Sequence, residues 1–364
     1  MSPVALRRQM GELLVAGFDG TSVPVELDAL ARQFGLGGAI LFARNVSEPA
    51  QVADLAFHLA RLTPDAPAWV SVDQEGGRVA RLKRPFTEWP PMATLGRSGD
   101  EGLARRVGQA LAAELRAVGV TLDYAPVLDV HTNPSNPVIG DRALSTDATV
   151  AARLGAVLVQ ALQDGGVAAC GKHFPGHGDT STDSHHELPL VEHPIEQLRV
   201  RELLPFRAAI DAGVATLMTA HVFLPALDET RPATLSRRIV HGLLRETLGY
   251  DGVVLSDDLE MKALSADYAV PEAAVLAIEA GCDGVLVCSS HYDTQAATIE
   301  ALIYAVETGR LALTRVEEAL ARIRRAKARW LPLALPAPRT DAQLRALLGC
   351  EAHQRVADEM ARFV

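Results

Sequence analysis

Short apolar runs alternate along the chain with longer stretches in which apolar residues recur every three or four positions. The runs predict buried strands, and the stretches predict helices with one face on a core. Eight runs show this pattern, at residues 13–18, 38–42, 68–72, 121–125, 167–171, 215–219, 252–256 and 284–288. The main helical stretches lie at residues 48–62, 101–118, 150–163, 195–212, 235–248, 271–280, 293–308 and 314–330.

Five of the predicted helices are followed by a glycine that suits a helix end: Gly119, Gly165, Gly213, Gly249 and Gly281. Eight strand–helix units in about 330 residues predict an α/β fold of the (β/α)8 type rather than an open doubly wound sheet. Prolines in residues 331–338 end the helical pattern. We therefore expect a catalytic barrel at residues 1–335 and a short helical tail at residues 336–364.

The composition narrows the class of partner. The net charge is −10, the pI is about 5.6 and hydrophobic residues make up 48% of the chain. An acidic chain without a basic patch is a poor partner for nucleic acid or an anionic membrane. No segment has the pattern of a leader peptide or a membrane span, and the four cysteines show no C-x-x-C spacing. We expect a cytoplasmic protein that is a monomer rather than an oligomer.

Charged residues follow the predicted strands at one end, where barrel enzymes place their chemistry. They are Asp73 and Arg81 after the third run, Asp129 and Arg142 after the fourth, Lys172 and His173 after the fifth, His221 after the sixth, and Asp257 and Asp258 after the seventh. The opposite ends are mostly glycine or apolar residues. This asymmetry predicts which end carries the active site.

The loop after the fifth run has the highest density of titratable groups. Residues 170–189 contain four histidines, a lysine, two aspartates and a glutamate. In an extended loop Asp183 and His185 point the same way, so the carboxylate can orient the imidazole and raise its basicity. This pair predicts a proton donor and acceptor near neutral pH, although a solvated polar loop has the same composition.

Asp257 follows an apolar strand and points into the predicted cavity. It could be a nucleophile, a metal ligand or a helix cap, and Asp258 is the better candidate for the cap. The side chains of Asp73, Arg81 and Arg142 offer the charged acceptor and the forked donors that sugar hydroxyls need. Alternatively, these residues form ordinary ion pairs on the surface.

Residues 172–180 together with Asp183, Ser184 and His185 resemble the signature of the β-N-acetylglucosaminidase branch of glycoside hydrolase family 3. Residues 256–261 resemble the nucleophile motif of this family and residues 72–79 resemble its substrate-binding loop; residues 38–45 and 136–142 are similar as well. The resemblance covers roughly residues 8 to 330. It implies a barrel that removes terminal β-linked N-acetylglucosamine from a small carbohydrate substrate with retention of configuration. We expect no cofactor and no metal.

The resemblance also implies roles for individual residues. Asp257 would be the nucleophile and His185 the general acid/base, assisted by Asp183. The sugar would be held by Asp73, Arg81, Arg142, Lys172 and His173. The branch acts on muropeptides from the cell wall during peptidoglycan recycling. Residues 347–361 look like the helix that starts a second domain in longer relatives.

Other functions remain open at this point. A metal-dependent amidohydrolase is indicated by Lys172, His173, His221 and Asp257, but this class needs a His-x-His pair after its first strand, where the chain has Asp19-Gly20-Thr21. A second alternative is a barrel that binds sugar without cleaving it, but such a protein has no use for a nucleophile. A β-glucosidase, or a phosphorylase that transfers the sugar to phosphate, would use the same groups.

Overall fold

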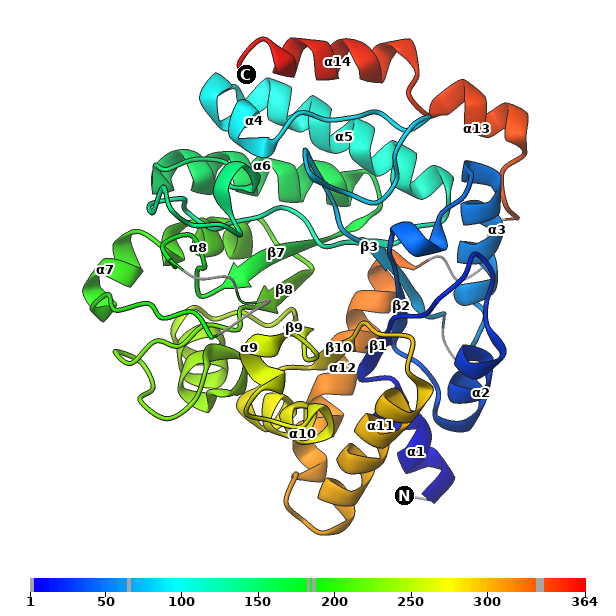
Figure 1. Ribbon diagram of the computed structural model, residues 1–364, viewed down its shortest axis with the longest axis vertical. Helices are drawn as coiled ribbons and strands as arrows, with labels where there is room; N and C mark the ends of the chain where they lie inside the picture. The colour runs from blue at the N-terminus through cyan, green and yellow to red at the C-terminus, as the bar shows by residue number, and fades with distance from the viewer. Residues whose placement is uncertain (1–2, 64–66, 182–183, 185–187, 332–336) are drawn as a thin grey trace.

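The computed structural model of the 364-residue chain describes residues 3–63, 67–181, 184, 188–331 and 337–364. Eight parallel strands close into a barrel in the order β1-β10-β9-β8-β7-β6-β3-β2 (Figure 1). The strands are β1 (Leu14–Ala16), β2 (Gly38–Leu41), β3 (Trp69–Val72), β6 (Leu122–Asp123), β7 (Ala168–Phe174), β8 (Thr216–Thr219), β9 (Val253–Asp258) and β10 (Gly284–Val287). The predicted (β/α)8 barrel is confirmed.

Helices surround the barrel (Figure 1). They are α1 (Pro3–Gly11), α2 (Val25–Phe34), α3 (Pro49–Leu59), α4 (Met92–Ser98), α5 (Glu101–Ala117), α6 (Ala148–Asp164), α7 (Ile195–Val200), α8 (Leu203–Asp211), α9 (Lys262–Ser265), α10 (Val270–Ala280), α11 (Tyr292–Glu307), α12 (Leu313–Trp330), α13 (Asp341–Leu347) and α14 (Glu351–Ala361). Short 3-10 turns lie at η1 (Ala43–Asn45), η2 (Gly140–Arg142) and η3 (Ala233–Leu235), and η4 (Arg238–Thr247) is a π-helix.

The helices bury the faces that their periodicity predicts. Helix α5 buries Leu103, Val107, Leu111 and Leu115, which are spaced four residues apart and therefore lie on one stripe. Each such side chain contributes roughly 1.5–3 kcal/mol when it leaves water. Helix α5 packs on α6, so these stripes hold the outer layer against the barrel.

Two strands extend further at their carboxyl ends than predicted. Strand β7 continues to Phe174 and β9 to Asp258. Lys172, His173 and Asp257 therefore lie within strands instead of in the loops that follow them. Side chains on strands are held more rigidly than side chains on loops, which suits groups that must keep a fixed geometry.

The region after β3 differs from the prediction. An antiparallel hairpin of β4 (Gln74–Gly76) and β5 (Val79–Ala80) follows this strand. Its turn needs Gly76 and Gly77, which have φ of +102° and +56°, and a Cβ on Gly77 would lie 2.9 Å from Cα of Pro91. Strands this short and polar leave no periodic signal in the sequence.

One predicted helix is wrong in its bounds. The helix expected at 195–212 is broken between α7 and α8, where Pro205 lies in the first turn of α8, a position at which its missing N–H costs no hydrogen bond. Gly165 is the C-cap of α6, as predicted; it keeps a helical φ of −72°, and the left-handed residue is the next one, Gly166, with φ of +81°. The other four predicted glycines have positive φ.

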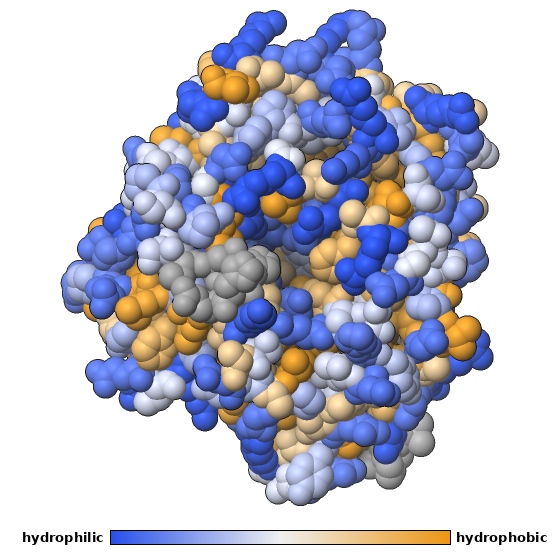
Figure 2. All heavy atoms as spheres, viewed as in Figure 1, coloured by the Kyte–Doolittle hydropathy of each residue, from blue (hydrophilic) through white to orange (hydrophobic). Residues whose placement is uncertain are grey.

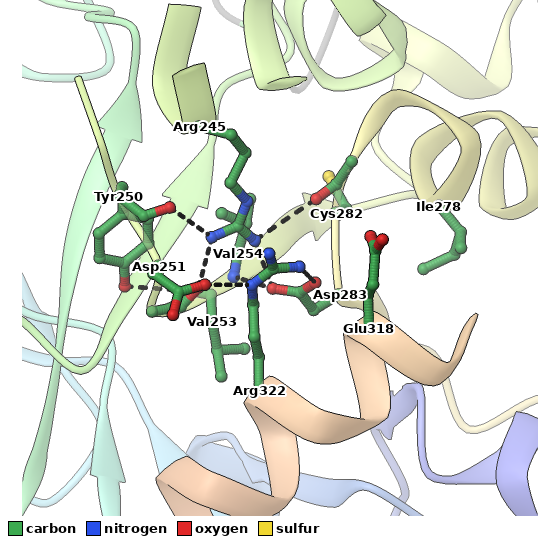
Figure 3. Close-up of polar contacts among 12 residues, drawn as sticks. Arg245, Tyr250, Asp251, Val253, Val254, Ile278, Cys282, Asp283, Glu318 and Arg322 are labelled. Carbon is green, nitrogen blue, oxygen red and sulfur yellow. Dashed lines mark hydrogen bonds and ion pairs between the residues drawn. The ribbon is translucent and has the colours of Figure 1, made fainter. Parts of the chain in front are cut away.

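A buried ion cluster closes the amino end of the barrel (Figure 3). Asp283, which precedes β10, has no exposed surface and accepts from the N–H of Val254 in β9 at 3.0 Å. Its carboxylate also pairs with Arg245, with Arg315 at 2.6 Å and with Arg322 at 3.4 Å. One carboxylate therefore links β9 and β10 to η4 and α12.

The C-terminal helices α13 and α14 lie along α3, α4 and α5 (Figure 1). Leu344, Leu348 and Met360 are buried in the same hydrophobic core as the barrel. Glu114 of α5 anchors this segment, because its Oε1 accepts from the N–H of Gly349 at 2.9 Å and lies 2.8 Å from Nδ1 of His353. Residues 336–364 thus include two helices, and their origin as part of a second domain stays a proposal. None of the helices that the structure describes could cross a bilayer, given their length and polarity.

Candidate active site

The carboxyl ends of the strands open into a cavity of about 200 Å³. Its walls include Asp73, Arg81, Arg142, Lys172, His173 and Asp257, which are the predicted site residues that the structure describes. The space-filling view shows this face hollowed near its centre, with hydrophilic side chains around the hollow (Figure 2). Residues up to 184 positions apart in sequence thus meet in one small space.

A larger hollow, of about 750 Å³, lies at the other end of the barrel. It is lined by Gly35 and Leu36, which precede β2, and by side chains of α2, α3 and α12. Volume alone does not locate the site. The smaller cavity is the better candidate because strand carboxyl ends and convergent polar groups meet there.

Asp257 lies near the end of β9 and is partly buried in the cavity wall. Its Oδ1 accepts from the N–H of Asp258 at 2.8 Å. Burial raises the pKa of the Asp257 carboxyl, but His221 and His173, together with the N–H of Asp258 and with Lys172, outweigh burial, so this pKa lies below its usual value. The carboxyl is therefore ionised at neutral pH, as a nucleophile must be.

Lys172 joins two carboxylates beside Asp257. Its Nζ lies 2.7 Å from Oδ1 of Asp73 and 2.6 Å from Oε1 of Glu75. Burial lowers the pKa of Lys172, but these two carboxylates more than compensate and raise it above its usual value. Nη2 of Arg142 lies 2.8 Å from the same Oε1 of Glu75. Two cations and two anions thus form one buried cluster.

Arg81 is held at the cavity wall by its neighbours. Its N–H donates to Oε1 of Gln74 at 2.9 Å, and its Nη2 lies 3.4 Å from Oδ2 of Asp73. Its guanidinium carbon lies 5.6 Å from the ring centre of Phe42, within the range of a cation–π contact. The contacts with Asp73 and Phe42 therefore hold the Arg81 side chain in place at the cavity wall.

Asp129 organises the start of the loop that follows β7. It is wholly buried, its Oδ2 lies 2.7 Å from Nδ1 of His173, and its Oδ1 accepts from the N–H of His177 at 2.7 Å. The contact to a carboxylate fixes a proton on Nδ1 of His173 and leaves Nε2 as the nitrogen available to a ligand.

The predicted dyad of Asp183 and His185 lies outside the described residues. Ser184, between them in sequence, is described. It is buried, it lines the cavity, and its carbonyl oxygen accepts from the N–H of Ala263 at 3.1 Å. Its hydroxyl lies 3.1 Å from Nε2 of His177. Ser184 is thus anchored to α9, the short helix that follows β9.

Asp258 does not cap a helix, and this prediction is wrong. Helix α9 begins at Lys262, with Met261 before it. Asp258 Oδ1 instead accepts from the N–H groups of Glu260 and Cys288, both at 3.2 Å. Burial, reinforced by the charges of Glu260 and Asp257, raises the pKa of Asp258 to about 7. Its carboxylate ties the end of β9 to the end of β10.

Sequence reasoning placed Asp129 at the active end but gave neither Asp129 nor Glu75 a role in the site. Both are buried carboxylates that bind predicted site residues, Glu75 through Lys172 and Arg142, and Asp129 through His173. Their position after the third and fourth strands was a signal, because every charged residue at those ends is a candidate. The partners of Glu75 and Asp129 were not predictable, because the ion pairs that these carboxylates form join residues far apart in sequence.

The arrangement offers an ionised carboxylate beside a cluster of fixed donors in a small enclosed space. This combination can attack an electrophilic carbon while several hydroxyls of a substrate are held. Within the described part of the chain, no three His, Cys, Asp or Glu side chains gather in a way that would hold a metal ion.

Comparison with known families gives one clear match. The family model "Glycosyl hydrolase family 3 N terminal domain" matches residues 5–326. The curated beta-hexosaminidase of Thiobacillus denitrificans is 44% identical over 260 residues, which cover 70% of this chain and 72% of that relative. The beta-hexosaminidase of Nitrosomonas eutropha is 41% identical over 284 residues, 76% of this chain and 81% of the relative.

Solved structures agree. A glycoside hydrolase family 3 beta-N-acetylglucosaminidase from a Paenibacillus species superposes with a TM-score of 0.92 at 42% identity, covering 98% of this chain and 68% of that chain. NagZ from Neisseria gonorrhoeae, in complex with N-trifluoroacetyl-D-glucosamine, superposes with a TM-score of 0.76 at 31% identity, covering 97% of this chain and 98% of its own.

Proposed function

Because the chain belongs to glycosyl hydrolase family 3 and is therefore a glycosidase, we propose that it hydrolyses terminal β-linked N-acetylglucosamine with retention of configuration. The observation that carries the proposal is that the ionised Asp257 shares one cavity with Asp73, Lys172 and His173. At about 200 Å³ this cavity is smaller than the ~300–1,000 Å³ of sites for drug-sized ligands, which favours one terminal sugar.

In the proposed mechanism Asp257 attacks the anomeric carbon and forms a covalent glycosyl-enzyme. His185, protonated and oriented by Asp183, donates its proton to the departing oxygen. The neutral imidazole then takes a proton from water, which releases the sugar and regenerates Asp257. Two successive displacements at one carbon return the β configuration.

A cationic histidine as the acid has an electrostatic consequence. Retaining glycosidases with two carboxyl groups must keep one of them protonated beside a negative neighbour. Here the protonated His185 and the ionised Asp257 attract each other. Ser184, which precedes His185 in sequence, lines the cavity that contains Asp257, and its carbonyl oxygen accepts from the N–H of Ala263 in α9.

The sugar would be held by the charged cluster. Asp73 and Lys172 can bind neighbouring hydroxyls, His173 can accept or donate at Nε2, and Arg81 and Arg142 have donors left at the cavity wall. We further propose that natural substrates are muropeptide fragments processed in the cytoplasm, on the strength of the family resemblance alone.

A panel of aryl β-glycosides tests the proposal. We expect turnover of the N-acetylglucosaminide to exceed that of the glucoside by at least tenfold, and proton NMR to detect the β-anomer as the first sugar released. An α-anomer released first would overturn retention, and equal or faster turnover of the glucoside would assign a β-glucosidase instead. A sugar phosphate formed when phosphate is added would show phosphorolysis.

A further inference from the structure

Helix α12 carries one lysine among its arginines, and this lysine lies on the buried face of the helix. The buried residues of α12 are Val316, Ala319, Leu320, Ile323 and Lys327, so Lys327 occupies a position of the apolar stripe. Its exposed fraction is 5%. A lysine is almost never this buried unless its ammonium group is paired. The position therefore needs a reason that packing does not supply.

No hydrogen bond or ion pair joins the ammonium of Lys327 to another residue that the structure describes. The negative charge of Glu12 acts on it, but both oxygens of this carboxylate accept from Arg324, from Nε at 3.0 Å and from Nη2 at 2.6 Å. Burial lowers the pKa of Lys327 to about 8, although Glu12 opposes this effect. Lys327 is thus a buried group that is mostly charged at pH 7, without a paired counter-ion among the described residues.

Lys327 lines the hollow of about 750 Å³ that lies at the end of the barrel opposite to the candidate active site. This volume is within the ~300–1,000 Å³ of sites that hold small molecules. Part of the wall is apolar and includes Val23, Leu36 and Leu62. Because an unpaired buried charge is costly, open space beside it suits a ligand of opposite charge. The apolar part of the wall suits the rest of an organic molecule.

The other charged groups of this hollow also favour a negative ligand. The described wall holds four cations and two carboxylates: Arg8, Arg32, Arg61, Lys327, Glu12 and Asp28. Asp28 pairs with Arg32 at 2.7 Å, and Glu12 is bound by Arg324, so both carboxylates are already paired. The guanidinium carbon of Arg61 lies 3.7 Å from the ring centre of Phe57. A guanidinium stacked on a ring keeps its N–H donors at its edge, where they can bind an anion.

We propose that this hollow is a binding site for a small organic anion, whose carboxylate or phosphate group pairs with Lys327. The apolar part of the ligand packs on Leu36 and Leu62, and Arg61 offers further donors from the same wall. The proposal does not depend on the proposed function, because the two sites lie at opposite ends of the barrel and share no residue.

The test titrates the intact protein at pH 7 with three probes and measures binding by calorimetry. Phenyl phosphate and benzoate present an aromatic ring with different anionic groups, and benzyl alcohol is the neutral match. We expect at least one of the two anions to bind, and benzyl alcohol to bind at least tenfold more weakly. The anion that binds more tightly shows whether the site prefers a phosphate ester or a carboxylate. Equal affinity for benzyl alcohol, or no binding of either anion, overturns the proposal.

Lys327→Met shows whether the anion binds in this hollow. Methionine keeps an unbranched apolar side chain without the charge, so we expect affinity for the aromatic anion to fall at least tenfold. Without ligand, the variant should resist urea better than the wild type, because a buried charge without a partner is gone. Lys83→Met removes an exposed lysine and should match the wild type in both measurements. Unchanged affinity in Lys327→Met would overturn the proposal and show a lysine that buries only its stem.

A chemical probe of the wild type decides the question even if Lys327→Met does not fold. The chain has four lysines: Lys83, Lys172, Lys262 and Lys327. Pyridoxal 5′-phosphate carries a phosphate and an aldehyde. A neutral lysine amine adds to this aldehyde with loss of water, and borohydride reduces the resulting imine to a stable amine that peptide mapping locates.

We expect Lys327 to be labelled at pH 8, where a pKa of about 8 leaves about half of its amine neutral. Exposed lysines, with an ordinary pKa of about 10.4, are almost wholly protonated at this pH and should react more slowly. The aromatic anion that binds in the titration should protect Lys327 from the label. A Lys327 that is not labelled, or that this anion does not protect, overturns the proposal.

Discussion

Arg142 holds Glu75 through two parallel hydrogen bonds, from Nε to Oε2 and from Nη2 to Oε1, each 2.8 Å long. This forked geometry is specific to a guanidinium and a carboxylate. Nη1 of Arg142 also donates to the carbonyl oxygen of Val138 at 3.1 Å, so Arg142 uses three of its donors on the protein and has fewer left for substrate. Glu75, which also contacts Lys172, sets the position of two cations in the cavity wall.

Removal of the charge on Glu75 should weaken both stability and substrate binding. Glu75→Gln leaves Lys172 and Arg142 buried with one carboxylate fewer, and we expect a loss of about 3–5 kcal/mol in the free energy of unfolding. Urea unfolding measures this loss, and a raised KM would report the displaced cations. Glu88→Gln, at an exposed pair with Arg84, should change stability by less than about 1 kcal/mol. Equal effects of both substitutions would contradict this account.

Asp257→Ala should abolish turnover without unfolding the protein. Loss of a covalent nucleophile typically costs about four to six orders of magnitude in kcat. Added azide can enter the space left by the carboxylate and attack from the same side, so we expect partial rescue with an α-glycosyl azide as product. Asp267→Ala, an exposed change on the loop after α9, is the control. A variant that keeps a tenth of the activity would refute the nucleophile assignment.

His185→Ala should affect substrates according to their leaving groups. A good leaving group departs without a proton, so an activated aryl glycoside should lose much less activity than a disaccharide, by at least about tenfold. Rates on both substrates measure the difference. Ser184→Ala is the neighbouring control and should not change the ratio. Equal losses on both substrates for His185→Ala would show that this residue only binds.

The parts of the site that sequence could predict are those fixed by the strands. The eight apolar runs give the barrel, and the barrel brings Asp73, Lys172 and Asp257 to one end. The resemblance to the family named the same residues. Asp129 and His221 are also expected at this end, but the contacts of Glu75, Asp129 and His221 could not be predicted, because they depend on which side chains face these residues across the barrel. Such contacts form only when the strands close, so no local pattern records them.

The buried ion cluster at Asp283 predicts a stability effect far from the chemistry. Asp283→Asn keeps the size of the side chain but leaves Arg245, Arg315 and Arg322 without their shared counter-ion. We expect a loss of about 3–5 kcal/mol in the free energy of unfolding. The kcat of the folded fraction should be unchanged, since this cluster lies at the opposite end of the barrel.

The control for this cluster is Asp251→Asn. Asp251 pairs with Arg322 and Arg325, but its side chain is 67% exposed. Water screens such pairs, so we expect a change of less than about 1 kcal/mol. If the two substitutions destabilise equally, burial is not what makes the Asp283 cluster important.

The neutral His177 predicts how stability depends on pH. Burial lowers its pKa from 6.5 to about 4. Between these values the unfolded chain binds a proton that the folded protein does not, so the free energy of unfolding falls as the pH is lowered from about 6.5 to 4. One proton changes this energy by at most about 1.4 kcal/mol per pH unit, or about 3 kcal/mol over the window. Above about pH 6.5 both states hold His177 neutral, and the effect vanishes.

Urea unfolding at several pH values between 4 and 7.5 measures this dependence. Carboxyl groups titrate in the same range, so the useful quantity is the difference between the wild type and His177→Asn, which lacks the titrating ring. We expect the variant to lose less stability than the wild type as the pH falls through the window, by up to about 3 kcal/mol. His58→Asn removes an exposed imidazole and should follow the wild type. Parallel curves for the wild type and His177→Asn would mean that the ring takes up its proton over the same pH range in the folded protein as in the unfolded chain, which would contradict a neutral His177.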